Sequence, residues 1–272
     1  MNLSYHCSGA IGAPVLFLLH GFLGSADDWQ PLIQALGSDY CLIAVDLPGH
    51  GSSYWEKEDA QGADYFCHRL EQTIQAIEQE QNLNLTRFSL LGYSLGGRLA
   101  MAYAIAFPDR IEQLILEGAH PGLVNEQEKE CRYQSDLEWA RRFNQEPVAE
   151  VLRDWYKQPV FSDLTEDQVT SLISQRIEGR SQGSGQLLAE ALMGFSLSRQ
   201  PDYRQAMLQI AAQVHYFHGE NDQKFGQLGQ QLLAEKVINS VQPIARCGHN
   251  IHREQPEAMA GLLRKLSGVR YE

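Results

Sequence analysis

The stretch LLGYSLGGRLAMAYA, residues 90–104, joins an apolar run to an Ala- and Leu-rich segment through one serine surrounded by glycines. The run before Ser94 is typical of a buried strand, and the segment after it is typical of a helix. A residue at the tip of such a sharp turn adopts a strained backbone, and glycines around it prevent side-chain collisions. The motif G-x-S-x-G therefore predicts a nucleophilic serine at a helix N-terminus, where backbone N–H groups favour negative charge.

Other segments of the chain repeat this strand-then-turn pattern. Their hydrophobicity is continuous rather than alternating, which indicates strands covered on both faces in a mostly parallel sheet. These apolar runs are residues 14–21, 40–51, 111–122, 214–222 and 241–249. Helical patterns lie between them, at about 64–82, 95–107, 225–236 and 254–267. The alternation predicts an α/β fold with a doubly wound, mostly parallel sheet.

Residues 124–199 interrupt the alternation. They show several helical patterns and no convincing strand, and Pro147, Pro159 and the sequence SQGSG at 181–185 separate the patterns. Ligands of open α/β sheets bind at the carboxyl ends of the strands. We therefore expect a helical cap, 124–199, inserted over that edge of a core formed by 1–123 and 200–272. The alternative is a set of extra helices packed on the sheet.

The composition limits the kinds of partner that the protein can bind and the compartment that suits it. The 272 residues carry a formal charge of −12, which argues against nucleic acid or an anionic membrane as a partner. The five cysteines are scattered without a C-x-x-C pair, which excludes a disulfide framework and a zinc site and suits a reducing compartment. The N-terminus lacks a secretory pattern. We expect a cytoplasmic protein with a small-molecule substrate, no metal or cofactor, and no obligate protein partner.

A serine hydroxyl needs two partners to react at neutral pH. An imidazole must accept its proton, and a carboxylate must hold the imidazole in the right tautomer. In this fold class the partners follow in the order Ser, Asp, His. Asp222 and His249 each follow a predicted strand, so both are expected at the edge of the sheet where Ser94 lies.

Each partner has competitors in the sequence. Glu220 is the fallback for Asp222, whereas Asp202 precedes a predicted helix and is interpreted as its first-turn acid. His252 competes with His249 but is also placed to cap the helix that follows it. Two further histidines flank a strand and are interpreted as structural: His215 and His218.

The segment LLHGFLG, residues 18–24, is expected to complete the site. It follows a strand, so the backbone N–H of Phe22 and that of Leu95 are placed to converge on a developing negative oxygen. One such donor commonly contributes about 3 kcal/mol to lowering a barrier. A second loop, residues 46–53, is rich in glycine and is expected to support the same edge.

The order and spacing of five motifs resemble the α/β-hydrolase superfamily along nearly the whole chain. They are HGFLG, DLPGHGSS, GYSLGG, HGEND and CGHNIHREQPE. Finer features are similar to one branch, the 2-succinyl-6-hydroxy-2,4-cyclohexadiene-1-carboxylate synthases of menaquinone biosynthesis. They are GYSLGGRLAM, EGAHPGL, DWYKQPVF, GENDQKF and GHNIHRE. EGAHPGL and DWYKQPVF carry most of this specificity.

The resemblance implies a lyase on a hydrolase scaffold. Its substrate, 2-succinyl-5-enolpyruvyl-6-hydroxy-3-cyclohexene-1-carboxylate, loses a ring proton and expels pyruvate, with Ser94 acting as the base that His249 activates. From the residues alone, the same groups suit either acyl transfer or proton abstraction. A hydrolase acting on an acidic substrate therefore stays open, and so does a ligand receptor, although a receptor has no chemical use for all three groups.

The resemblance also implies how three substrate carboxylates are bound. It assigns them to Arg98, Arg132 and Arg176, with Trp155 and Tyr93 lining the pocket. The guanidinium fork suits a carboxylate best among the cationic side chains. Arg98 also lies one helical turn after the serine, so its side chain is expected at the same edge.

Overall fold

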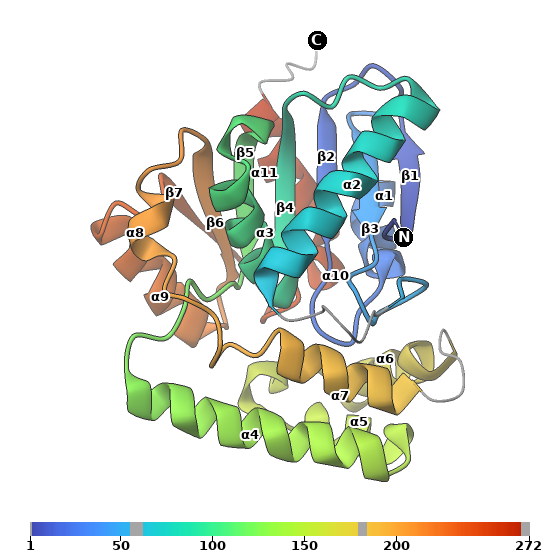
Figure 1. Cartoon of the computed structure of the whole chain (residues 1–272), viewed down its shortest axis with the longest axis vertical. Coiled ribbons are helices and arrows are strands. Elements are labelled where there is room, and N and C mark those ends of the chain that lie inside the picture. The colour runs from blue at the N-terminus through green and yellow to red at the C-terminus, as the bar shows by residue number, and fades with distance from the viewer. Residues whose placement is uncertain (1, 55–61, 179–183, 268–272) are drawn as a thin grey trace.

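A computed structural model describes residues 2–54, 62–178 and 184–267. Its strands form one seven-stranded sheet in the order β1-β3-β2-β4-β5-β6-β7, in which β1 runs antiparallel to β3 and all other pairs are parallel (Figure 1). The strands are β1 (Tyr5–Gly9), β2 (Val15–Leu19), β3 (Cys41–Val45), β4 (Phe88–Tyr93), β5 (Ile111–Glu117), β6 (Gln213–Gly219) and β7 (Ser240–Ile244). The predicted α/β-hydrolase fold class is confirmed.

Helices cover both faces of this sheet. They are η1 (Ala26–Trp29), α1 (Gln30–Leu36), α2 (Ala63–Gln81), α3 (Leu95–Ala106), η2 (Pro108–Arg110), α8 (Arg204–Met207), α9 (Gln223–Ala234), α10 (Ile251–Glu254) and α11 (Pro256–Ser267). Alternate residues of β2 face opposite cores: Phe17 packs with α2 and α3, and Leu18 packs with α1 and α11. This two-sided burial is the reason for the continuous hydrophobicity of the strands.

The sequence patterns missed short elements. β1 is largely exposed and has little apolar signal, so its pairing with β3 decides its conformation. The short helix α1 was also missed, although Pro31 lies in its first turn as expected for a helix start. The single helix predicted over 254–267 is wrong at its start, because Pro256 begins a separate helix, α11, after the one-turn α10.

A second layer of helices follows β5. It consists of α4 (Glu126–Gln145), α5 (Val148–Trp155), η3 (Pro159–Phe161), α6 (Glu166–Glu178) and α7 (Ser184–Gly194). Figure 1 shows this layer across the carboxyl ends of the strands, on the side where β4 runs into α3. The described part of 124–199 contains no strand, and part of the SQGSG sequence lies outside the described residues.

The α4–α7 layer has a small core of its own. Phe143 of α4, Leu152 of α5 and Leu188 of α7 are almost fully buried there, and Leu23 from the loop after β2 joins them. Local signals start the helices: the Asn125 side chain caps α4 by accepting from two backbone N–H groups. None of the helices within the described ranges is long and apolar enough to cross a membrane.

Candidate active site

The turn between β4 and α3 has the strain that its sequence predicts. Ser94 has φ +50° and ψ −108°, a left-handed conformation that costs free energy for a side-chain-bearing residue. Its backbone N–H donates to Glu117 O at 2.8 Å, which fixes the turn against β5. A Cβ on Gly96 would lie 2.1 Å from Leu19 O, so only glycine allows α3 to start this close to β2.

The structure brings His249 and Asp222 together. His249 Nδ1 lies 2.6 Å from Asp222 Oδ2, and both side chains are almost completely buried. Asp222 also caps α9, where its other oxygen accepts from the backbone N–H of Phe225. Gly118, at φ +54°, allows the imidazole to approach, because a Cβ there would lie 2.6 Å from the ring. Asp222, rather than Glu220, is thus the carboxylate paired with this histidine.

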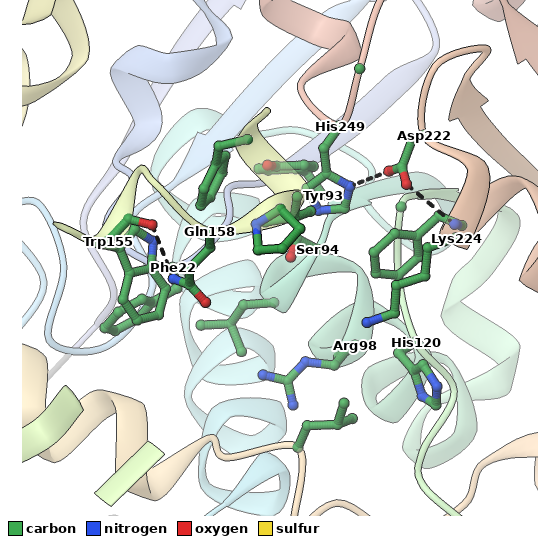
Figure 2. A pocket seen from close by; sticks show the side chains of 18 of the residues that line it. Phe22, Tyr93, Ser94, Arg98, His120, Trp155, Gln158, Asp222, Lys224 and His249 are labelled. Atoms are coloured by element: carbon green, nitrogen blue, oxygen red, sulfur yellow. Dashed lines mark hydrogen bonds and ion pairs between the residues drawn. The ribbon is translucent and has the colours of Figure 1, made fainter. Parts of the chain in front are cut away.

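Ser94 lies beside this pair at the centre of the pocket (Figure 2). Among the described residues, the ring of His249 is hydrogen-bonded to Asp222 and not to Ser94. Phe225 and Tyr93 hold the imidazole, with ring centroids 4.7 and 5.1 Å from it. The hydrogen bond between a reactive serine and its histidine is often long in the absence of substrate and shortens only when substrate is bound.

The oxyanion-hole residues lie on the other side of the serine. Phe22 and Leu95 both line the pocket, Phe22 from the loop after β2 and Leu95 from the first position of α3. The ring of Phe22 packs 5.1 Å from that of Trp155. Both residues thus border the same pocket as Ser94, and the oxyanion-hole role predicted for their backbone N–H groups stays a prediction.

His20 organises the loop that carries Phe22. It is fully buried, its Nε2 accepts from Leu47 N–H at 3.0 Å, and its Nδ1 lies 2.7 Å from Gly21 O. Burial lowers the pKa of His20, so the ring is neutral and can donate through one nitrogen while it accepts through the other. The imidazole therefore fastens the loop after β2 to the loop after β3. As expected, the segment 46–53 supports this edge.

The pocket has a volume of about 650 Å³ between the sheet and the α4–α7 layer. The layer contributes aromatic and cationic side chains: Trp139 and Arg132 from α4 and Trp155 from α5. Arg98 enters from the sheet side, one turn after the serine. Four of the residues expected to bind substrate therefore lie in one cavity: Tyr93, Arg98, Arg132 and Trp155.

The two pocket arginines differ in how their charge is neutralised. Arg132 Nε donates to both oxygens of the buried Asp136, at 2.8 and 2.9 Å. Arg98 donates instead to the neutral oxygens of Gln200 and Phe195, and no ion pair with a carboxylate of the described residues involves it. Burial, with a further contribution from Arg132, lowers the pKa of Arg98 to about 9. Arg98 is still charged at neutral pH, so an anionic ligand would stabilise it.

Arg176 does not line this pocket, although the sequence resemblance placed it among the substrate-binding residues. Its guanidinium group donates to both oxygens of Asp28, at 2.6 and 2.7 Å, and both side chains are buried. Arg253 of α10 adds a third bond to Asp28 at 3.0 Å. Arg176 is thus paired with the carboxylate of η1 outside the pocket, and the ion pair joins α6 to the core. No motif around Asp28 indicates that it is this partner.

This ion pair predicts a pH dependence of stability. Burial alone would raise the pKa of Asp28, but Arg176 and Arg253 lower it to about 2, from an ordinary 3.8. A carboxyl group with a lowered pKa stabilises the fold above its unfolded pKa and loses this contribution as pH falls toward its folded pKa. We expect Asp28 to account for a loss of about 2 kcal/mol of unfolding free energy between pH 5 and pH 2.

Urea unfolding of wild type and of Asp28→Asn across this range checks the prediction. The variant should be less stable at pH 5 and should lose less stability as the pH falls. Asp27→Asn is the control. The Asp27 side chain is 61% exposed, and its ion-pair partner, His6, is also exposed and lies 3.8 Å away. Equal pH slopes for wild type and Asp28→Asn would contradict this account.

A second buried pair lies beneath the nucleophile. His252 Nδ1 lies 2.8 and 2.9 Å from the two carboxylate oxygens of Glu117, and both side chains are essentially unexposed. The ring of Tyr93 lies 4.8 Å from this imidazole. His252 is thus a structural partner for the end of β5 rather than a rival of His249. The two histidines that were expected to flank a strand lie within β6, outside the pocket: His215 and His218.

Comparison with known proteins agrees with this geometry. The sequence matches the alpha/beta hydrolase fold family over residues 14–256. The 2-succinyl-6-hydroxy-2,4-cyclohexadiene-1-carboxylate synthase of Enterobacter sp. (strain 638) is 39% identical over 263 residues, covering 97% of this chain and 95% of that protein. Its counterpart in Salmonella paratyphi C (strain RKS4594) is 40% identical over 265 residues, covering 97% and 96%. The structure of MenH from S. aureus superposes with a TM-score of 0.85 at 25% identity, covering 98% of this chain and 99% of that one.

Proposed function

The chain belongs to the α/β-hydrolase fold family and, within it, to the 2-succinyl-6-hydroxy-2,4-cyclohexadiene-1-carboxylate synthases, and we propose that Ser94, His249 and Asp222 carry the chemistry. The reaction eliminates pyruvate from 2-succinyl-5-enolpyruvyl-6-hydroxy-3-cyclohexene-1-carboxylate, a step of menaquinone biosynthesis. The observation that carries the proposal is the Asp222–His249 pair beside Ser94, in a pocket with a partly buried arginine, Arg98, that has no carboxylate partner among the described residues.

The elimination needs a base at one ring carbon and an acid at the leaving oxygen. Asp222 holds the Nδ1–H of His249, so Nε2 is free to take the proton of Ser94 as the hydroxyl oxygen removes the proton from C2. The C2–H electrons form C2=C3, the C3=C4 electrons shift to C4=C5, and the C5–O bond breaks. The proton that His249 received passes to the departing enolpyruvate, which becomes pyruvate, and the ring is left as the 2,4-diene.

Charge develops on the succinyl carbonyl oxygen when the adjacent C2 proton leaves. We propose that the backbone N–H groups of Phe22 and Leu95 stabilise this enolate oxygen. Both residues border the space beside Ser94. No metal or cofactor enters this scheme. The elimination requires a base, a proton for the leaving group, an oxyanion hole and cations that hold the substrate carboxylates.

The cations on the pocket wall account for recognition of a polycarboxylate. We propose that Arg98 and Arg132 bind substrate carboxylates, with Tyr93 and Trp155 against the ring and its substituents. Arg98 supports this proposal because its partly buried guanidinium group has only neutral oxygen partners in the described chain. Residues 124–199 are then the cap that supplies the upper wall of the pocket. The scattered free cysteines suit the cytoplasm as the compartment.

Arg132→Gln is expected to raise KM for the enolpyruvyl substrate by roughly tenfold or more, with a smaller effect on kcat. A charged hydrogen bond made in both the ground state and the transition state affects mainly KM. Steady-state kinetics of pyruvate release measure both constants. The matched control is Arg141→Gln, on the same helix and 51% exposed beside Glu138. An unchanged KM for Arg132→Gln would remove Arg132 from the binding site.

Incubation of the purified protein with the enolpyruvyl substrate tests the function as a whole. Pyruvate release can be followed continuously with lactate dehydrogenase, and the diene by its absorbance. Stoichiometric appearance of both products is expected. Faster turnover of a simple aryl acetate than of this substrate would favour the hydrolase interpretation instead.

A further inference from the structure

The substrate carries three carboxylates, on the succinyl chain, the ring and the enolpyruvyl group. The Arg and Lys side chains that line the pocket in the described residues are Arg98, Arg132 and Lys224. Arg176 is instead engaged with Asp28 outside the pocket. We propose that Lys224 binds a substrate carboxylate, the role that the sequence resemblance gave to Arg176. This inference rests on the proposed function.

The position of Lys224 suits this role. It lies in the first turn of α9, two residues after Asp222, and its Nζ lies 5.5 Å from the centroid of the Phe225 ring. Phe225 packs against His249 in turn. Figure 2 shows the Lys224 side chain extending into the pocket, on the side of Arg98 and His120. The ammonium group therefore lies on the same wall as the catalytic pair.

The charge of Lys224 is available for a ligand. No carboxylate of the described residues forms an ion pair with it, and the acid nearest to it in sequence, Asp222, is bound to His249. Two other lysines are paired instead: Lys129 with Glu126 and Lys157 with Asp154. An unpaired ammonium group at the wall of a pocket binds a carboxylate more favourably than a paired one, since no existing partner has to be displaced.

His120 does not supply the missing charge. It lines the same pocket, and its Nδ1 accepts from the backbone N–H of Gly122 at 3.1 Å. Burial first, then the nearby cations Arg204 and Lys224, lower the pKa of His120 to about 4. The imidazole is therefore neutral at physiological pH. It can help to orient a ligand by hydrogen bonding, but the third positive charge of this wall is that of Lys224.

Lys224→Gln is expected to raise KM for the enolpyruvyl substrate about tenfold, with kcat within about threefold of wild type, because the lost contact serves binding. Lys224→Arg keeps the charge and should restore KM to within about threefold. The control is Lys265→Gln in α11, which removes one positive charge from an exposed residue that does not line the pocket. An unchanged KM for Lys224→Gln overturns the inference.

The dissociation constants of substrate and product show which substrate carboxylate Lys224 binds. Fluorescence quenching of the pocket tryptophans gives Kd for the product with the wild type and each Lys224 variant, and for the substrate in the Ser94→Ala background. The product lacks the enolpyruvyl carboxylate, so weaker binding of the substrate alone assigns Lys224 to that group. Weaker binding of both assigns it to the succinyl or ring carboxylate, and weaker binding of neither overturns the inference. If the wild type releases no pyruvate from the enolpyruvyl substrate, the proposed function fails instead.

Discussion

Ser94→Ala is expected to lower kcat for pyruvate release by about a thousandfold or more, with little change in substrate affinity. The variant lacks the oxygen that takes the ring proton, while Arg98, Arg132 and the aromatic wall are unchanged. His249 alone lies one side chain further from the substrate, so it is poorly placed to replace the missing base. Alanine also keeps the tight turn, since its Cβ occupies the position of the serine Cβ.

Single-turnover pyruvate release measures the chemical step, and equilibrium binding of substrate measures affinity separately. Ser89→Ala is the matched control: it lies on the same strand, β4, outside the pocket. The control should behave as wild type. Turnover by Ser94→Ala within tenfold of wild type would show that another group removes the proton, and loss of affinity alone would favour a ligand receptor.

The sequence predicts the architecture well where burial is complete. β2 to β6 are recognisable because both faces of the sheet are covered, which leaves continuous apolar runs such as Val15–Leu19. β1 has no such pattern, since its residues are largely exposed and only its pairing with β3 specifies a strand. Local sequence cannot report a conformation that is decided by a distant partner.

The residues proposed to be catalytic are predictable for a related reason. Ser94 directly follows β4, and Asp222 and His249 lie in the loops after β6 and β7, so parallel topology places them at one edge. Arg176 has no such constraint. It lies on α6, and its direction depends on Asp28, which is 148 residues away in sequence and became a neighbour only through folding. A resemblance in sequence predicts which type of residue occupies a position, but not which charged group that residue pairs with.

Lys224 differs from Arg176, because the local sequence is enough to predict its position. It lies inside the motif GENDQKF, and the helix that Asp222 caps fixes which way the next residues point. Its position two residues after the triad carboxylate would have been enough to place it near the pocket. Its significance, however, depends on the absence of Arg176 from the pocket wall, which only the structure shows.

His249→Ala is expected to reduce kcat about as strongly as Ser94→Ala, by about a thousandfold or more. Without the imidazole, the serine proton has no acceptor, and the hydroxyl is too weak a base to remove a proton from carbon. Asp222 would remain buried without its partner, so the variant should also be less stable, and its fold must be checked by thermal unfolding. His218→Gln is the control, since the hydrogen bond of this ring within the described residues is to Gly219 O and the residue does not line the pocket.

The double variant Ser94→Ala, His249→Ala then tests whether the two residues act as one unit. If His249 acts only through Ser94, removing both should cost no more than removing either one, as in serine hydrolases whose triads act together. The quantity to compare is kcat under saturating substrate for the wild type, both single variants and the double variant. Losses that multiply would show that the imidazole and the hydroxyl work independently, and the serine would then no longer be the base that His249 activates.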